Sequence, residues 1–377
     1  MTRAAGSVFV AVGTTDGGFL LSSTSSRKSW TKSSSFLRGE SVNNFAYSTE
    51  DDRIYAATLT EGVFVSKDLG KTWKSVSRGL NVRKTWTVAV DPKDPNVLYA
   101  GTHYGHLFRS TDAGEEWEEV TGLHTAPKRS EWGIDWAFGT TGLCIHTVRV
   151  DPKNGKRLYI IASGKGPYRS EDGGKSWSLL QDGVMQACPV GAGSQAPDIP
   201  SSKKARELRE HLNTVHSCTH KLVISQTDTN KVYQQNHCGV YSSANGGKSW
   251  TDRSPANALR HGFPIALVEG GAEGLYVVPA FQGICKTHNS CIKKELAVYR
   301  SGDGGNTWEK LTDGLPKNVH TCVLRDGMST DGLDQAGLYF GTTTGEVYSS
   351  SDGGDSWSSL AKGVGRVQGV VSFSPLR

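Results

Sequence analysis

The sequence SKDLGKTW at Ser66–Trp73 decides the fold, because its pattern of serine, aspartate, glycine and tryptophan returns along the chain. The pattern, Ser-x-Asp-x-Gly-x-x-Trp, indicates two strands joined by a tight turn. The aspartate carboxylate accepts hydrogen bonds from backbone N–H groups of its own turn, and glycine supplies the positive φ that the turn needs. The tryptophan begins the returning strand and is expected to bury its ring between layers.

Six copies keep this Asp-box pattern, and a seventh has partly lost it. The six begin at Ser66, Ser110, Ser170, Ser243, Ser301 and Ser350. The fourth of them has Asn245 in place of the aspartate, and the weakest copy, Ser23–Trp30, keeps only the serine and the tryptophan. A pattern that recurs along the whole chain indicates a repeat architecture, in which each copy is one structural unit.

Around each box the hydrophobic pattern predicts four strands, lettered A to D in chain order. In the third unit these are Thr87–Val90, Val97–Thr102, Leu107–Ser110 and Trp117–Thr121. The first unit lacks an A strand, whereas Val367–Phe373 near the C-terminus is an A strand with no unit of its own. We therefore expect an all-β, seven-bladed β-propeller with residues 1–377 as one domain. The last strand would complete the first blade and leave no free sheet edge.

Long insertions are predicted on one face of this ring. The remaining A strands are expected at Asn44–Tyr47, His146–Val150, His220–Ser225, Pro264–Val268 and Thr321–Arg325. Because strands alternate in direction, the D-to-A and B-to-C connections emerge together on one side, called here the upper face. The insertions 123–143, 180–217 and 281–296 fall in these connections, and the second contains a predicted amphipathic helix, Ser201–Asn213. Functional loops often gather on one end of a rigid scaffold.

Composition and charge exclude several classes of partner. The chain has 377 residues, is 36% hydrophobic and 21% charged, and carries a formal net charge of +5. It has no apolar stretch long enough to cross a bilayer and no basic stripe with interleaved aromatic residues. We therefore expect neither a membrane nor nucleic acid as a partner. Met1–Gly6 lead into a strand without the apolar region of a signal peptide, which predicts a cytoplasmic protein.

The repeats resemble those of the BNR/Asp-box propeller superfamily over almost the whole chain. That superfamily contains sialidases, xyloglucanases, sortilin-type receptors and photosystem II assembly factors. It also contains many sialidase-like bacterial and archaeal proteins without an assigned activity. The segments CIHT, CTHKL, QNHCG and GFPI, which begin at Cys144, Cys218, Gln235 and Gly262, are most similar to that last group. The resemblance implies a propeller, and the box itself does not specify a substrate.

A true sialidase is the least favoured of the activities that the resemblance implies. Sialidases bind a substrate carboxylate with three arginines and carry an Arg-Ile/Leu-Pro motif, which this sequence lacks. Arg109, Arg169 and Arg300 belong to predicted C strands, away from the channel. Xyloglucanases need two propellers that face each other across a cleft, and the sequence predicts one.

The histidines and cysteines map to the predicted upper face and its rim. Cys144/His146 and Cys218/His220 occupy equivalent positions in adjacent blades, and His237 stands at the end of the neighbouring B strand. Residues i and i+2 share a side of a strand, so both pairs are expected at the channel mouth. Imidazole and thiolate ligands suit zinc, copper or iron. The alternative is that the histidines cap strand ends and the cysteines fill small core spaces.

We predict His146, His220 and His237 as ligands of a divalent transition metal. His146 and His220, together with Glu131, are the predicted catalytic residues, because Glu131 lies among the aromatic residues of the first insertion and is placed for acid–base work. The residues expected to contact substrate are His103, Trp86, Arg325 and His320. Arg325 would anchor an anionic group or pair with Asp326.

Two classes of function stay open from the sequence. The first is a metal-dependent enzyme, most generically a hydrolase, that acts on a small molecule at the upper face. The second is a non-catalytic propeller that docks a protein or a glycan. Cys285–Cys291 is a separate candidate for a local disulfide or a small metal site.

Overall fold

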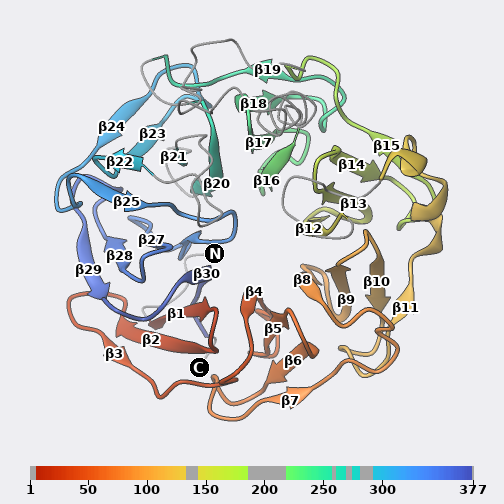
Figure 1. Cartoon of the computed structure of the whole chain (residues 1–377), viewed down its shortest axis with the longest axis horizontal. Helices are drawn as coiled ribbons and strands as arrows, with labels where there is room; N and C mark the ends of the chain where they lie inside the picture. Colours follow the sequence, from red (N-terminus) through yellow and green to blue (C-terminus); the bar gives the residue numbers. More distant parts are fainter. Residues whose placement is uncertain are drawn as a thin grey trace, which may run out of the picture.

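The computed structural model describes residues 6–132, 143–185, 218–256, 260–268, 274–280 and 292–375. Within these ranges the strands form seven four-stranded antiparallel sheets around a central axis (Figure 1). The predicted all-β, seven-bladed propeller is therefore confirmed. No helix in the described ranges is both long enough and apolar enough to span a membrane. Most of the three predicted insertions, the helix predicted at Ser201–Asn213 and the pair Cys285–Cys291 lie outside the described residues.

The blades are numbered in chain order, and each runs from an innermost A strand to an outer D strand. Blade 1 contains β30 (Val367–Phe373), β1 (Ser7–Thr14), β2 (Gly18–Thr24) and β3 (Thr31–Lys32). Blade 2 contains β4 (Val42–Tyr47), β5 (Ile54–Thr58), β6 (Gly62–Ser66) and β7 (Lys74–Ser75). Blade 3 contains β8 (Thr85–Asp91), β9 (Asp94–Thr102), β10 (Leu107–Ser110) and β11 (Glu118–Glu119). The 3-10 helices η1 (Thr121–Thr125) and η2 (Arg129–Glu131) follow it.

The second half of the ring repeats this order. Blade 4 contains β12 (Ile145–Asp151), β13 (Asn154–Ala162), β14 (Gly166–Ser170) and β15 (Ser178–Leu179). Blade 5 contains β16 (Thr219–Ile224), β17 (Val232–Asn236), β18 (Gly239–Ser243) and β19 (Thr251–Asp252). Blade 6 contains β20 (Gly262–Val268), β21 (Gly274–Pro279), β23 (Val298–Ser301) and β24 (Glu309–Leu311). Blade 7 contains β26 (Met328–Thr330), β27 (Leu338–Gly341), β28 (Val347–Ser350) and β29 (Ser358–Ala361).

Ring closure follows the predicted route. The C-terminal strand β30 pairs antiparallel with β1, in a register that sets Phe373 opposite Phe9 and Val370 opposite Val12. The rings of Phe9 and Phe373 stack at a centroid distance of 5.6 Å. The first blade therefore takes its innermost strand from the end of the chain, and both edges of the array are paired.

The predicted A strand of the seventh blade is wrong. Thr321–Arg325 does not form the innermost strand, which is β26 instead. The strand β25 (Val319–Thr321) ends where the predicted segment begins, and it pairs with β22 (Ile292–Lys294) in a separate two-stranded sheet. A turn follows, in which the N–H of Gly327 donates to the carbonyl of Leu324. Arg325 and Asp326 thus lie on the loop that enters blade 7, where the chain approaches the channel.

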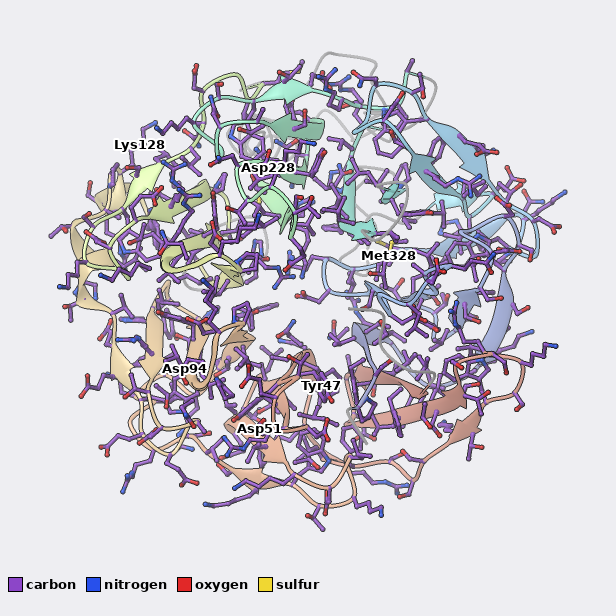
Figure 2. The ribbon with its side chains drawn as sticks, turned by 180° about the vertical axis from the view of Figure 1, so that it is seen from behind. Tyr47, Asp51, Asp94, Lys128, Asp228 and Met328 are labelled. Carbon is purple, nitrogen blue, oxygen red and sulfur yellow. The ribbon has the colours of Figure 1, made fainter. Side chains whose placement is uncertain are left out.

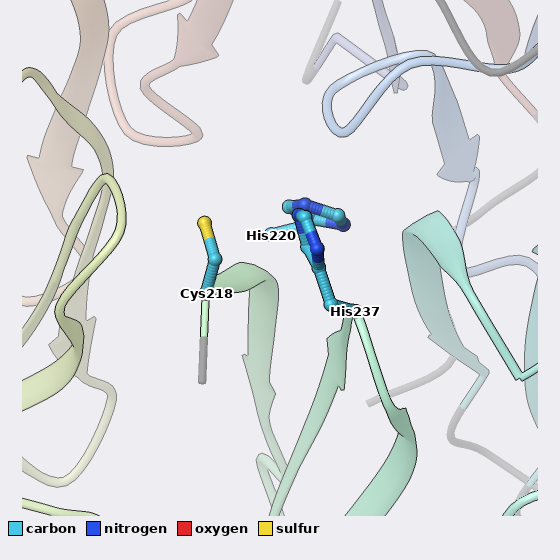
Figure 3. A group of neighbouring side chains, drawn as sticks. All are labelled: Cys218, His220 and His237. Carbon is cyan, nitrogen blue, oxygen red and sulfur yellow. The ribbon is translucent and has the colours of Figure 1, made fainter. Parts of the chain in front are cut away.

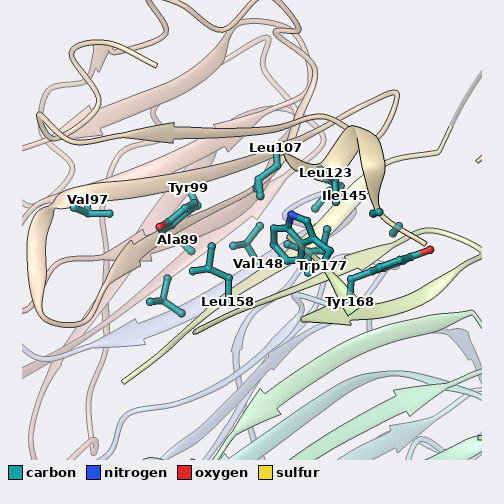
Figure 4. Packing of buried hydrophobic residues seen from close by; sticks show 14 residues of the cluster. Ala89, Val97, Tyr99, Leu107, Leu123, Ile145, Val148, Leu158, Tyr168 and Trp177 are labelled. Carbon is teal, nitrogen blue, oxygen red and sulfur yellow. The ribbon is translucent and has the colours of Figure 1, made fainter. Parts of the chain in front are cut away.

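The Asp boxes form the turns that the sequence predicts. In blade 2 the backbone N–H of Thr72 donates to Asp68 Oδ1 at 2.9 Å, and Ser66 Oγ accepts from the N–H of Gly70 at 2.8 Å. Gly70 has a φ of 79°, as the turn requires. Four box tryptophans, Trp117, Trp177, Trp250 and Trp357, are buried, and Figure 4 shows Trp177 among apolar residues of blades 3 and 4.

Hydrogen bonds between blades reinforce this packing at the boxes. The hydroxyl groups of Tyr55, Tyr159 and Tyr276, each on the B strand of one blade, donate to the box carbonyls of Ala113, Gly246 and Gly353 in the next blade. These tyrosine rings are deeply buried, so each hydroxyl satisfies an inter-blade carbonyl away from bulk water. Figure 2 shows the ring from behind, with the A-to-B turn residues Asp51, Asp94 and Asp228 spread around it.

Candidate metal centre

Bulges in the innermost strands aim side chains at the channel. In five blades the pairing between the A and B strands skips one A-strand residue at the same height. The skipped residues are Gln368, Asn43, Trp86, His146 and His220. A bulge re-aims a side chain, which is why bulges are common beside functional sites. His146 and His220 are thus the skipped residues of adjacent blades, and they occupy the equivalent positions that the sequence predicts.

One group of potential metal ligands lies at the inner end of blade 5. Cys218, His220 and His237 each offer a ligand atom, and these atoms lie within 4.8 Å of one another. Figure 3 shows the three side chains projecting from adjacent strand ends, with the two imidazoles side by side. Cys218 and His220 are buried, and His237 is half-buried in the turn after β17.

Backbone groups of the neighbouring blades orient two of these ligands. The Nδ1 atom of His220 lies 2.6 Å from the carbonyl oxygen of Gly262 in blade 6. A carbonyl can only accept, so Nδ1 carries the proton and Nε2 keeps its lone pair. The N–H of Gly164 in blade 4 donates to the sulfur of Cys218 at 3.2 Å. The thiol itself donates to the carbonyl of Thr219 at 3.9 Å, and it would lose this proton on binding a metal.

The imidazoles of His220 and His261 are held neutral. Burial, followed by the neighbouring His237, His261 and Arg325, lowers the pKa of His220 well below 6.5. Burial also lowers the pKa of His261 to about 4. Neutral imidazole is the form that coordinates a metal, so these rings need not lose a proton at pH 7 before they bind one.

His261 is a part of the site to which the sequence analysis assigned no role. Its ring centroid lies 5.2 Å from that of His220 and 4.8 Å from that of His237. Phe263 follows it and stacks on His220 at 4.3 Å. His261 precedes Gly262, which pairs with Pro279 at the end of β21. In blade 5 Thr219 pairs in the same way with Asn236 at the end of β17. Alignment of the A strands on their bulges would have matched His261 with Cys218.

The predicted ligand His146 lies outside the compact group. It is 1% exposed, in blade 4, and its Nδ1 is 3.3 Å from Thr147 Oγ1. Its Nε2 is buried and has no hydrogen-bond partner among the described residues. Burial and the positive charges of Arg325 and Lys221 lower the pKa of His146 well below 6.5. The role of His146 as a ligand stays a prediction.

Of the predicted substrate contacts, the structure places Trp86 and Arg325 together. The guanidinium carbon of Arg325 lies 5.9 Å from the ring centroid of Trp86 and 6.0 Å from that of Phe263. His103 is buried beside Tyr104, at a centroid distance of 4.5 Å. His320 is exposed on β25, apart from the blades. Glu131 ends η2, and its side chain lies outside what the structure describes.

An ion pair that the sequence analysis missed crosses the channel. Lys221 of blade 5 pairs with Asp326 from the loop that enters blade 7, and both side chains are about 6% exposed. Asn44 of blade 2 also donates to Asp326, at 3.3 Å. Burial, together with the neighbouring charge of Arg149, lowers the pKa of Lys221 to about 8 despite this pairing.

A second group of potential ligands lies on blade 3. His106 Nδ1 and His124 Nε2 lie 2.5 Å and 2.8 Å from the same oxygen of Glu119. Their side chains are 27% and 47% exposed, against 21% for Glu119. The three groups already satisfy one another in contact with solvent, so we interpret them as a surface hydrogen-bonded cluster and use them below as a control.

The cysteines near the channel differ in whether they carry a free thiol. Cys238, next to His237, is disulfide-bonded, so its sulfur is not available as a thiolate ligand. Cys144, Cys218 and Cys322 carry thiols and are buried. Among these, only Cys218 belongs to a compact ligand group in the described residues.

Comparisons with known proteins agree with the fold. Residues 2–130 match the family model of the DUF6242 beta propeller domain. A probable oligoxyloglucan-reducing end-specific xyloglucanase of Neosartorya fischeri is 24% identical over 287 residues, which cover 70% of this chain and 33% of that protein. Xyloglucanase Xgh74A of Acetivibrio thermocellus is 32% identical over 273 residues, which cover 65% of this chain and 28% of that protein. The chain spans about a third of the length of these relatives.

Solved structures show the same architecture. An ancestral GH74 enzyme superposes with a TM-score of 0.53 at 19% identity and covers 88% of this chain, which spans 39% of that enzyme. YCF48 bound to a D1 peptide superposes with a TM-score of 0.52 at 12% identity, over 90% of this chain and 92% of YCF48. The likeness to these structures shows a shared propeller fold.

Proposed function

We propose that this propeller binds a divalent transition metal, zinc, copper or iron, through Cys218, His220 and His237, and that the metal serves a hydrolase-type reaction on a small molecule. The observation that carries the proposal is the clustering of three ligand atoms from two adjacent strand ends within 4.8 Å. One thiolate and two imidazoles form a ligand set that suits these metals.

The distances fit a metal after small side-chain movements. Tetrahedral zinc with bond lengths of about 2.0–2.3 Å holds its ligand atoms roughly 3.3–3.7 Å apart. The side chains of Cys218, His220 and His237 would therefore close by about 1 Å on binding. The ring orientation of His220 is already set by Gly262, which is the arrangement that second-shell carbonyls provide in metal sites.

Three protein ligands leave a coordination position for another molecule. A metal held in this way acts as a Lewis acid on a carbonyl or phosphoryl oxygen. Phe263 and His261 cover one side of His220 and limit its contact with water. In this proposal the protein residues hold the metal, fix the ring tautomer and keep the imidazoles neutral.

A glycan-binding propeller is the second candidate. It is favoured by the sequence match to xyloglucanases, which covers 65% to 70% of the chain. The named activity belongs to those longer proteins. In this alternative the upper face would bind a glycan, and the histidines would serve only to pack the channel mouth.

Metal analysis of the purified protein separates the two candidates. The protein would be loaded with zinc, dialysed and analysed by mass spectrometry for bound metal. We expect about one equivalent in the wild type and its loss in the His220→Ala/His237→Ala double variant. The double variant His106→Ala/His124→Ala removes two histidines from the surface cluster and is the matched control, which should keep the metal. Equal metal in all three proteins, or none in the wild type, would reject the proposal.

A further inference from the structure

Three buried polar groups from different parts of the ring meet at the channel without protein partners. They are the Nε1 of Trp86 in blade 3, the Nε2 of His146 in blade 4 and the Nε of Arg325 on the loop into blade 7. None of these atoms has a hydrogen-bond partner in the described part of the chain. Arg325 lies 5.9 Å from the Trp86 ring, and Trp86 and His146 are the skipped residues at equivalent positions of the adjacent innermost strands β8 and β12.

These groups cannot satisfy one another. The indole N–H and the guanidinium N–H groups are donors only. His146 could supply one acceptor, yet its Nε2 contacts neither of them at hydrogen-bond distance. A buried donor without an acceptor costs about 1–3 kcal/mol, so a set of such donors at one place indicates that an acceptor from outside the chain belongs there.

The charge at the channel indicates what kind of acceptor this is. Arg149 and Arg325 both lie close enough to Lys221 for their positive charges to lower its pKa. The carboxylate within this group is that of Asp326, and Lys221 already pairs with it. Arg325 has no carboxylate partner among the residues that the structure describes. Buried or partly buried cations are normally paired, so the missing partner is an anion.

We infer that the channel mouth binds the anionic group of a small molecule, a carboxylate or a phosphate, with Arg325 as its charge partner and Trp86 as a second donor. Arg325 matches such a group because its planar guanidinium donates two parallel hydrogen bonds to carboxylate or phosphate oxygens. Trp86 donates from one side, and His146, when its Nε2 carries the proton, donates from another.

An anionic small molecule bound in this way would be the substrate of the proposed metal site. Only its reaction depends on the proposed function, whereas its binding does not. His220 is the link between the two sites. It is a proposed metal ligand, it stacks on Phe263 at 4.3 Å, and the guanidinium of Arg325 lies 6.0 Å from the same Phe263 ring. A small molecule whose anionic end is held by Arg325 would therefore present its other end toward the metal ligands of blade 5.

Equilibrium dialysis of radiolabelled inorganic phosphate against metal-free protein tests the anion site without the metal. The ionic strength is kept constant with chloride. We expect saturable binding to the wild type, about tenfold or more weaker binding to Arg325→Gln, and an intermediate loss in Arg325→Lys, which keeps the charge but not the fork. Trp86→Phe keeps the ring, removes the donor and should weaken binding severalfold.

The control is Arg38→Gln, which removes one positive charge from an exposed residue of the loop between blades 1 and 2 and should leave phosphate binding unchanged. If the wild type shows no saturable binding, or if Arg325→Gln binds as well as Arg38→Gln, the inference is wrong. The same variants are then analysed for zinc. If Arg325→Gln loses phosphate binding but still binds zinc, the result supports an anion site that is separate from the metal site. If the wild type binds no zinc but still binds phosphate through Arg325, the result contradicts only the metal proposal.

Discussion

The Nδ1 atom of His220 in blade 5 donates to the backbone carbonyl of Gly262 in blade 6 at 2.6 Å. The contact joins two blades and fixes the direction in which the other ring nitrogen presents its lone pair. The bulge in β16 makes it possible, since the skipped residue is aimed out of the strand pairing. The proposed metal chemistry therefore depends on a feature of the ring as a whole.

The tautomer of His220 can be observed directly. We predict a neutral ring with its proton on Nδ1 at pH 7, and no protonation of Nε2 as the pH is lowered to 6, because burial lowers the pKa well below 6.5. Nitrogen-15 NMR of histidine-labelled protein reports both ring nitrogens, and the His220→Gln variant assigns the signal. An imidazolium signal from His220 at pH 6 would contradict the burial argument.

His237 and His146 should respond differently to substitution. His237→Gln removes a member of the ligand group and should weaken zinc binding by about 10- to 100-fold or more. His146→Gln removes a ring outside the group and should change zinc affinity by less than about twofold. Competition with a chromophoric chelator measures both affinities. A larger zinc defect in His146→Gln than in His237→Gln would restore His146 as the ligand that the sequence predicts.

The inter-blade tyrosines should contribute measurably to stability. Tyr276→Phe removes the hydrogen bond to the Gly353 carbonyl and should lower the free energy of unfolding by about 1 kcal/mol. Tyr159→Phe should cost a similar amount, because an arginine also donates to each of the two carbonyls, Arg300 to Gly353 and Arg169 to Gly246. Urea unfolding of these variants is compared with Tyr104→Phe, whose side chain is exposed. Equal stability of Tyr276→Phe and Tyr104→Phe would show that the inter-blade bond contributes nothing.

The Asp boxes should make the fold sensitive to acid. Hydrogen bonds from the hydroxyl and backbone N–H of Thr72 lower the pKa of Asp68 to about 2, and Ser176 does the same for Asp172. The folded pKa lies below the unfolded value of about 3.9. The stabilisation is therefore complete above pH 4 and is lost as the pH falls toward 2.

A natural comparison for this acid effect exists in blade 5. Asn245 makes the same backbone contact, accepting from the N–H of Ser249 at 3.0 Å, without a titratable group. The Asp68→Asn/Asp172→Asn variant should therefore lose less stability between pH 4 and pH 2 than the wild type does. Thermal unfolding midpoints at a series of pH values measure this, and parallel pH profiles for the two proteins would refute it.

The box turns and the ring closure could be predicted from the sequence because their signals are local. The spacing of Ser, Asp, Gly and Trp determines each turn, and Val367–Phe373 matches β30 residue for residue. The seventh A strand was misplaced because the apolar residues of Thr321–Arg325 resemble a strand, whereas the chain there leaves β25 and turns before β26 begins. Local pattern does not determine such a competition.

The candidate site was harder to predict, because bulges set it. A skipped residue changes which side chains share a face, and the hydrophobic pattern of β16 does not show where the skip falls. Cys218, His220 and His237 were expected together at the channel mouth, whereas the contacts of His261 depend on the spacing of blades 5 and 6. The pairing of Lys221 with Asp326 joins residues 105 positions apart, beyond the reach of any local motif.

X-ray absorption spectroscopy of the zinc-loaded protein tests the central claim most directly, because it counts the atoms bound to the metal. With Cys218, His220 and His237 as ligands, the spectrum should contain one sulfur at about 2.3 Å and two or more nitrogen or oxygen atoms at about 2.0 Å. The sulfur signal should disappear in Cys218→Ser and persist in Cys144→Ser. A wild-type spectrum with nitrogen and oxygen neighbours alone, or a sulfur signal that survives Cys218→Ser, would contradict the account.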